Sequence, residues 1–356
     1  MKWLLSLGGL LAGVLLAFFL FIYLPSREVP SLIPRCLFCA GLPSKLEHRM
    51  HAGDPGAVLQ EKPPRSYVSL LERKAVSDRF PSIFDGRASD VPWLRPSQKI
   101  RESSIAGLQA AYVQEYEIDS WGRRKTAGAR DLLLMGCSYV FGSGVEDSQT
   151  LPARLGAFNL GNAGDSPPSI FLRSQDPRYF AGIPSASTAI YYLIPDHVPR
   201  ALGSYHLSRS WGWSLPRFEL QGGKPVHVGM QGKLGLPDAV FSAWQYLEYL
   251  GITWPLFYTD RDMELVAALL AGIQENYLRA FPKGKFLVVI APKLQAQPIT
   301  YDLRAQLEAK GITYLDYGDR EIHDYVAAPF IPADGHPSAS YYSKVSEWIA
   351  KDLLAN

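Results

Sequence analysis

Apolar and polar positions follow two different periods over the C-terminal part of the chain. Short runs of aliphatic, β-branched and aromatic residues predict buried parallel strands, at residues 132–135, 158–160, 188–194, 285–290 and 312–315. Segments with apolar residues three or four positions apart predict helices, at residues 150–155, 260–281, 303–310 and 338–354. Strands that alternate with helices imply an α/β domain, whose largely parallel five-stranded sheet is covered on both faces.

The N-terminal segment has a third pattern, because residues 3–26 are uncharged and almost entirely apolar. A stretch of this length can cross the ~30 Å hydrocarbon core of a membrane as one helix. A cleaved signal peptide is the alternative, but it needs small residues before the cut. No alanine occurs between Ala17 and Ala40. We therefore predict an uncleaved transmembrane helix at residues 1–26.

Three further regions differ in composition. Residues 27–100 are rich in proline and have only short apolar runs, which predicts an irregular stalk or small subdomain. Residues 101–356 contain the α/β domain, and residues 107–119 suggest an amphipathic strand ahead of the sheet. Residues 201–258 interrupt the alternation with an insertion that holds half of the chain's eight tryptophans. Its aromatic rings either stack on sugar rings beside the site or form a small hydrophobic subcore.

The overall composition narrows the function classes. The 36 Lys and Arg residues against 34 Asp and Glu leave a net charge of +2, which argues against a dedicated nucleic-acid-binding protein. Three cysteines exclude a small protein built on a disulfide framework. We expect no cofactor.

One cluster close to the predicted membrane surface has metal-ligating side chains. Cys36 and Cys39 stand three positions apart, as do His48 and His51. Together they are four candidate zinc ligands, although the eight residues between the two pairs are fewer than in common zinc-finger patterns. A local disulfide or two free thiols are the alternatives. A c-type haem is excluded in its usual form, because Ala40 follows Cys39 where histidine is needed.

Candidate catalytic residues lie in three glycine-containing segments, each next to a predicted element. Ser138 directly follows the first strand of the predicted sheet, with glycines on both sides. In open α/β sheets, ligands bind at the carboxyl ends of the strands. Residues 159–165 (Asn-Leu-Gly-Asn-Ala-Gly-Asp) form a second glycine-rich loop after a strand, and Asp334 and His336 precede the last predicted helix. Serine, aspartate and histidine are a complete set of triad chemistries.

These segments resemble the motif blocks of the SGNH/GDSL hydrolase family, over about residues 131–354. Residues 136–138 (Gly-Cys-Ser) match the first block, with cysteine in place of the usual aspartate. Residues 159–164 match the second block, and residues 334–337 (Asp-Gly-His-Pro) resemble the last one. The resemblance implies a three-layer flavodoxin-like fold with a mostly parallel sheet.

The resemblance also implies a role for each candidate residue. Ser138 would attack an ester carbonyl, and His336 would take its proton and later give it to the leaving alcohol. Asp334 would hold the imidazole in the right tautomer. The backbone N–H groups of Ser138 and Gly164 would stabilise the oxyanion. The alternative is that Ser138 is only a turn residue and His336 a residue at the start of a helix.

Two departures from the family pattern affect this interpretation. Asp334 and His336 are two positions apart instead of three, a spacing that resembles periplasmic SGNH-like O-acetyltransferases of exopolysaccharide biosynthesis. Pro195 stands where the third block supplies an asparagine to the oxyanion hole. His197 is the nearest replacement donor, and losing such a donor typically costs ~10²–10³ in rate. The alternative is that His197 bonds a neighbouring segment.

We therefore predict a serine-dependent esterase that acts on O-acyl groups, in particular O-acetyl, of an envelope or exported polysaccharide. It would be a single-pass protein of the cytoplasmic membrane with its catalytic domain on the periplasmic side. That orientation follows from the resemblance, since Lys2 before the anchor and Arg27 and Arg35 after it do not favour export. The alternatives are acetyl transfer to a sugar, which needs a multi-span membrane partner, and a catalytically silent glycan-binding or assembly protein.

Overall fold

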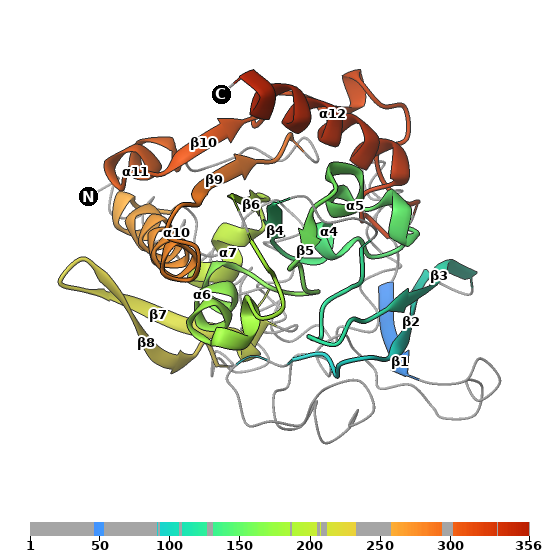
Figure 1. The fold of residues 1–356 in the computed structure, drawn as a ribbon, viewed down its shortest axis with the longest axis horizontal. Helices are drawn as coiled ribbons and strands as arrows, with labels where there is room; N and C mark the ends of the chain where they lie inside the picture. Colours follow the sequence, from blue (N-terminus) through green and yellow to red (C-terminus); the bar gives the residue numbers. More distant parts are fainter. Residues whose placement is uncertain are drawn as a thin grey trace, which may run out of the picture.

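The computed structural model describes residues 46–52, 91, 93–106, 109–126, 131–185, 187–204, 207, 212–232, 258–293, 302–332 and 334–355. Its centre is a parallel sheet with the strand order β10-β9-β6-β4-β5 (Figure 1). The strands are β4 (Leu132–Met135), β5 (Phe158–Asn159), β6 (Thr188–Leu193), β9 (Lys285–Ile290) and β10 (Thr313–Asp316). Numbered in chain order, these five strands have the flavodoxin-like order 2-1-3-4-5. The prediction of a five-stranded parallel sheet is confirmed.

Helices cover the sheet on both faces (Figure 1). One face packs against α6 (Pro167–Gln175), α7 (His197–Leu202), α10 (Asp260–Ala280) and α11 (Arg304–Ala309). The other packs against α4 (Ser138–Phe141), α5 (Leu151–Leu155) and α12 (Ala339–Ala355). Short 3₁₀ turns lie at η3 (Asp147–Gln149), η4 (Pro177–Tyr179), η5 (Gly212–Ser214) and η6 (Ile322–Asp324).

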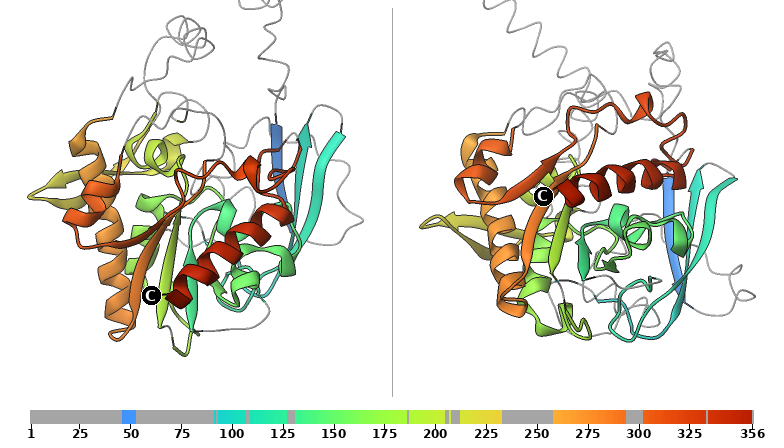
Figure 2. Two further views of the ribbon diagram at one scale, coloured as in Figure 1. Left: turned by 90° about the horizontal axis from the view of Figure 1, so that it is seen from above. Right: turned by 45° about the horizontal axis from the view of Figure 1, so that its top comes forward.

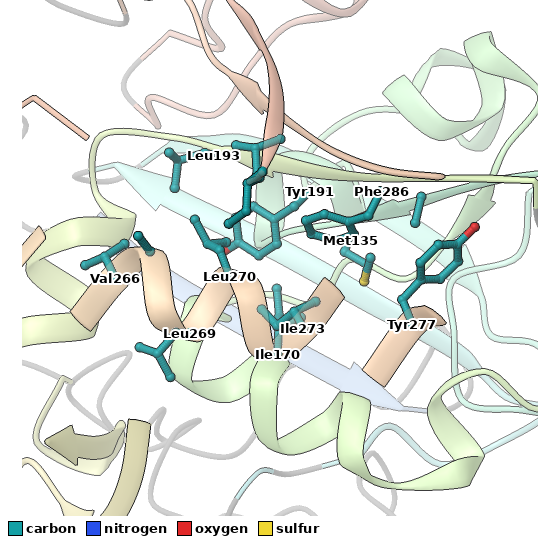
Figure 3. Packing of buried hydrophobic residues seen from close by; sticks show 14 of the residues in the cluster. Met135, Ile170, Tyr191, Leu193, Val266, Leu269, Leu270, Ile273, Tyr277 and Phe286 are labelled. Atoms are coloured by element: carbon teal, nitrogen blue, oxygen red, sulfur yellow. The ribbon is translucent and has the colours of Figure 1, made fainter. Parts of the chain in front are cut away.

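The apolar runs of the strands explain the two layers of core. Along β6, Tyr191 points into the cluster under α10 and Tyr192 into the cluster under α12, because successive side chains in a strand point to opposite faces. Figure 3 shows Tyr191 with Leu270 and Ile273 of α10. Thr259 caps α10, since its side chain accepts a hydrogen bond from the Asp262 N–H at 3.3 Å.

A small antiparallel sheet stands beside this α/β core. It consists of β1 (Leu46–Ala52), β2 (Lys99–Ala106) and β3 (Gln109–Glu117), in that order. Part of the segment predicted as an irregular stalk or small subdomain is therefore β-strand, and Trp93 from the same segment packs into the core under α10. The pairing of β1 with β2 cannot be read from the sequence, because residues 53–98 separate the two strands.

The segment predicted as an aromatic insertion contains a β-hairpin of β7 (Pro216–Gln221) and β8 (Lys224–Met230). Phe218 of β7 packs edge-on against Phe171 of α6, with 5.4 Å between ring centroids. Most of the tryptophans and tyrosines of the insertion lie outside the described residues. Their proposed part in a sugar-binding groove stays a prediction.

The predicted anchor at residues 1–26 also lies outside the described residues. Among the helices that the structure describes, none has both the length and the apolar character needed to cross a membrane.

A buried arginine joins the small sheet to the α/β core. Arg124, whose side chain has no exposed surface, donates hydrogen bonds to the carbonyls of Phe141 (3.0 Å), Gly142 (2.5 Å) and Val145 (2.7 Å). Its Nε donates to Asp147 at 2.9 Å. Buried guanidinium groups need such partners, because an unpaired buried charge is very costly. This clamp fixes the segment that follows α4.

We expect Arg124→Met to destabilise the protein strongly. The substitution removes the guanidinium donor of three carbonyls. The Phe141 carbonyl keeps the Asn159 amide at 3.2 Å and the Gly142 carbonyl keeps the Val145 N–H at 3.3 Å. The Val145 carbonyl loses its Arg124 donor, so the free energy of unfolding should fall by about 1–3 kcal/mol or more. Chemical denaturation would measure the change. Lys125→Met is the matched control, because Lys125 is exposed and its ion pair with Glu117 (3.0 Å) should contribute less than about 1 kcal/mol. Equal losses for the two variants would contradict the clamp.

Candidate active site

Ser138 is the first residue of α4 and lies at the carboxyl end of the central strand β4. The N–H groups of Val140 and Phe141 both donate to the Cys137 carbonyl at 2.9 Å, which closes the turn immediately after the strand. This place is the topological switch point of the sheet, where β5 and β6 lie on opposite sides of β4. The Cys137 thiol is fully buried, and burial raises its pKa, so it stays protonated beside the serine.

The structure brings the three predicted triad residues together from distant parts of the chain. His336 Nε2 lies 2.9 Å from Ser138 Oγ, and His336 Nδ1 lies 2.5 Å from Asp334 Oδ1. The Asp334 side chain is fully buried, and that of His336 is 16% exposed. The hydrogen-bonded order serine, histidine, carboxylate is the arrangement that activates a serine hydroxyl.

The short spacing of Asp334 and His336 has a geometric basis. Asp334 Oδ1 accepts the backbone N–H of His336 at 3.0 Å as well as its ring Nδ1. The residue between them, Gly335, has φ +88°, a conformation that favours glycine. The tight turn therefore presents one carboxylate oxygen to two donors of the same residue. Tyr139 holds the turn from α4, because its hydroxyl donates to the Gly335 carbonyl at 3.1 Å.

Ser104 is a site residue that the sequence did not reveal. Its hydroxyl donates a hydrogen bond to Asp334 Oδ2, from strand β2 of the small sheet. The two residues are 230 positions apart, and Ser104 belongs to no motif. Only the three-dimensional pairing of β2 with its neighbours places it there.

The second glycine-rich loop follows β5 and lies against the turn of Ser138. The Asn162 N–H donates to the Gly136 carbonyl at 3.2 Å. A Cβ on Gly161 would stand 2.4 Å from the Phe141 backbone nitrogen, so only glycine permits this approach. Gly164 comes two residues after Asn162, in the same loop at the carboxyl end of β5.

A buried ion pair fixes this loop on its far side. Arg173 of α6 lies 2.9 Å from Asp165 Oδ2, and both side chains are at most 5% exposed. Burial raises the pKa of Asp165, and the neighbouring Arg173 opposes that rise. Arg200 of α7 donates to the Asp165 carbonyl at 3.3 Å. The predictions from sequence included neither Arg173 nor Asp165 in the site.

His197, the predicted replacement donor, is completely buried at the start of α7. Its Nδ1 lies 3.1 Å from the Tyr191 hydroxyl of β6. Burial lowers the pKa of His197 well below its usual value, and Arg200 lowers it further, so the ring is neutral. A ligand could reach this ring only if neighbouring side chains moved. The structure therefore favours the alternative in which His197 bonds an adjacent element.

The candidate zinc ligands are not assembled by the part of the chain that the structure describes. His48 and His51 belong to β1, and Cys36 and Cys39 lie outside the described residues. Within those residues no group of three or more histidine, cysteine or acidic side chains could hold a metal ion. The zinc site stays a prediction.

No protein-family model matches the sequence, and no curated protein matches it either. Among solved structures, a carbohydrate esterase family 2 enzyme from Corynascus thermopiles (Myceliophthora fergusii) has 12% identity and a TM-score of 0.36, over 77% of this chain and 85% of that one. An acetyl xylan esterase from the rumen bacterium Butyrivibrio proteoclasticus has 10% identity and a TM-score of 0.35, over 72% and 74%.

A third solved structure is a carbohydrate esterase described as having divergent catalytic and non-catalytic binding functions, with 8% identity and a TM-score of 0.35, over 74% of this chain and 91% of that one. At TM-scores this low the likeness carries no argument about function. The functional interpretation rests on the side chains described above.

We expect His197→Ala to lower stability and to leave kcat close to that of the unchanged protein. The substitution removes the partner of the buried Tyr191 hydroxyl, which costs about 1–3 kcal/mol. Thermal unfolding and ester hydrolysis, measured on the same preparation, test this. His323→Ala is the control, because His323 is exposed on η6. A fall in kcat of ~10²–10³ with an unchanged thermal midpoint would instead make His197 an oxyanion donor.

Proposed function

We propose that this protein is a serine-dependent esterase of the SGNH type that removes O-acyl groups, in particular O-acetyl, from an envelope or exported polysaccharide. The observation that carries the proposal is the continuous hydrogen-bonded chain from Asp334 through His336 to Ser138. Structural serines and histidines rarely need a buried carboxylate aligned behind them. The choice of a polysaccharide rests on the family resemblance and on the predicted anchor.

In the proposed mechanism, Ser138 Oγ attacks the ester carbonyl carbon while its proton moves to His336 Nε2. Asp334 stabilises the imidazolium that forms and keeps Nδ1 protonated. The tetrahedral oxyanion would accept hydrogen bonds from the backbone N–H groups of Ser138 and Gly164. Collapse of this intermediate breaks the bond to the sugar oxygen, which takes the proton from His336 Nε2 and leaves as the free hydroxyl.

The second half of the reaction decides between two activities. In hydrolysis, water loses a proton to His336 and attacks the acyl-Ser138 carbonyl. The bond to Ser138 Oγ then breaks, Oγ takes the proton from His336, and acetate leaves. In transfer, a sugar hydroxyl takes the place of water and the acyl group moves to a new glycan. The two-residue spacing of Asp334 and His336, which resembles the periplasmic O-acetyltransferases, favours keeping transfer as the second candidate. One membrane anchor could not carry acetyl groups across the bilayer, so transfer needs a multi-span partner.

We expect a fluorophosphonate probe to label Ser138 in the purified protein. A probe of this type phosphonylates an activated serine, and His336 lies at 2.9 Å to activate it. Mass spectrometry would locate the modified residue. Ser138→Ala should abolish labelling, while Ser143→Ala, which changes a buried serine five positions later, should keep it. A folded protein that is not labelled would favour the silent glycan-binding alternative.

We also propose that residues 1–26 remain as a membrane anchor, with the catalytic domain on the periplasmic side. The uncharged apolar segment, followed by no small-residue cleavage site, supports this. The full chain is expected to sediment with membranes and to resist extraction at high pH. N-terminal sequencing of native material that finds a start near residue 27 would contradict the proposal.

A further inference from the structure

We propose that Ser104 is a positioning residue of the triad, which holds the Asp334 carboxylate so that its other oxygen stays on His336. This inference rests on the proposed function, since it gives Ser104 a task in the chain from Asp334 to Ser138. It also makes the small N-terminal sheet part of the active site, although the sequence predicted a domain boundary at residue 100.

The contacts of Asp334 divide between its two oxygens. Oδ1 accepts the ring and backbone N–H groups of His336, and Oδ2 accepts the Ser104 hydroxyl. Neither Ser104 nor the Asp334 side chain has exposed surface. Hydrogen bonds away from water are stronger and more directional than exposed ones. A donor on each oxygen therefore fixes the rotation of the carboxylate as well as its position.

The position of Ser104 in its sheet is well defined. It lies on the central strand β2, paired with His48 of β1 on one side and Tyr112 of β3 on the other. The register with β3 shifts between Ser104 and Ile105. The extra residue lies on β3, between Ala110 and Tyr112, and bulges of this kind are frequent next to active sites. Ser104 itself lies on the strand without the insertion, held between two neighbours.

The same sheet also contacts the segment that carries the nucleophile. The Tyr116 hydroxyl of β3 accepts the Gly144 N–H at 2.7 Å and donates to Glu102 of β2 at 2.6 Å. Figure 2 shows the start of α12, which follows the Asp334–His336 turn, beside this sheet in both views. The small sheet thus touches the loop after Ser138 and the loop before α12, and it fixes one relative to the other.

The hydrogen bond has an electrostatic consequence with a definite sign. The Asp334 carboxylate beside His336 favours the charged imidazolium. Without the Ser104 hydroxyl the carboxylate is free to rotate, Oδ1 leaves the ring N–H for part of the time, and the pKa of His336 falls. If Ser104 only supported the fold, the protein that remains folded would keep Asp334 on His336, and the pKa of His336 would stay the same.

Among the residues that the structure describes, Tyr139 and Glu102 lie near this pair, and neither changes that sign. Tyr139 faces His336 from α4, with 5.9 Å between the ring centroids. Burial raises the pKa of Tyr139 well above its usual value, so the phenol stays neutral wherever histidine titrates. Glu102, two residues before Ser104 on β2, is held by Tyr116, and a substitution at Ser104 leaves that contact in place.

The test compares the full-length protein with its Ser104→Ala variant. NMR titration of histidine-labelled protein gives the pKa of His336, with the signal assigned from His336→Gln. Hydrolysis of p-nitrophenyl acetate against pH gives kcat and KM. We expect the pKa of His336 to fall and kcat to fall by about 10-fold to 100-fold, the range that a misplaced catalytic group costs, with KM unchanged. A pKa that rises or stays the same would overturn the proposal.

Three further variants keep the result interpretable. Ser104→Thr keeps the hydroxyl and should restore kcat and the pKa. Ser104→Cys nearly preserves the side-chain volume, but the thiol is a weaker donor than the hydroxyl. This variant serves as the test if Ser104→Ala does not fold. In that case, a pKa of His336 equal to that of the unchanged protein would count against the role of Ser104. Ser346→Ala removes another buried serine hydroxyl, which bonds the Ser343 carbonyl at 2.9 Å, and should change neither quantity.

The two proposals fail in distinguishable ways. The NMR titration needs no turnover, so it tests the coupling of Ser104 to His336 even if no substrate is found. If the fluorophosphonate probe does not label Ser138 but the pKa of His336 falls in Ser104→Ala, the esterase proposal fails and the positioning role stands. If Ser138 is labelled and the pKa is unchanged, only the role of Ser104 fails.

Discussion

A buried carboxylate is the constraint on which the site depends. Removing a charged group from water is costly unless hydrogen bonds replace the lost solvation, and the Asp334 side chain has no exposed surface. Its donors come from His336, one residue beyond Gly335, and from Ser104 on a strand far away in the chain. Satisfying one charge therefore requires the small sheet, the turn before α12 and the histidine ring to be in place together.

The loop after Ser138 is also held by a buried charged group, in this case a positive one. Arg124 follows β3, and its buried guanidinium is met by the carbonyls that end α4 and by Asp147. It also stacks over the Tyr116 ring, 4.0 Å from the ring centroid. Two buried charges, one negative and one positive, thus connect the β1–β2–β3 sheet to both loops of the site. The sheet is a structural part of the α/β domain and not a spacer.

Most of the central sheet could be predicted because its signal is local. Residues 132–135 and 286–290 are unbroken apolar runs; the first forms β4, and the second forms β9 together with Lys285. Ser138 and His336 were found through glycine-bracketed motifs next to such elements. Ser104 and Arg173 were missed, because a single serine in a strand or an arginine in a helix has no local pattern. Their partners Asp334 and Asp165 are fixed only by the tertiary fold.

Pro195 and His197 together define what remains of the oxyanion hole in the proposed mechanism. Pro195 has no N–H to donate, and the buried His197 ring bonds Tyr191 instead. The stabilising donors are then backbone amides alone, and their efficiency depends on how rigidly Gly164 is held. The loop that contains Gly164 is fixed through Asp165, whose carboxylate meets Arg173 and whose carbonyl meets Arg200. Preorganised dipoles need no rearrangement as charge develops. In the proposed mechanism, rigid anchoring of the loop with Gly164 is therefore the physical means by which a site without the asparagine side chain can still stabilise an oxyanion.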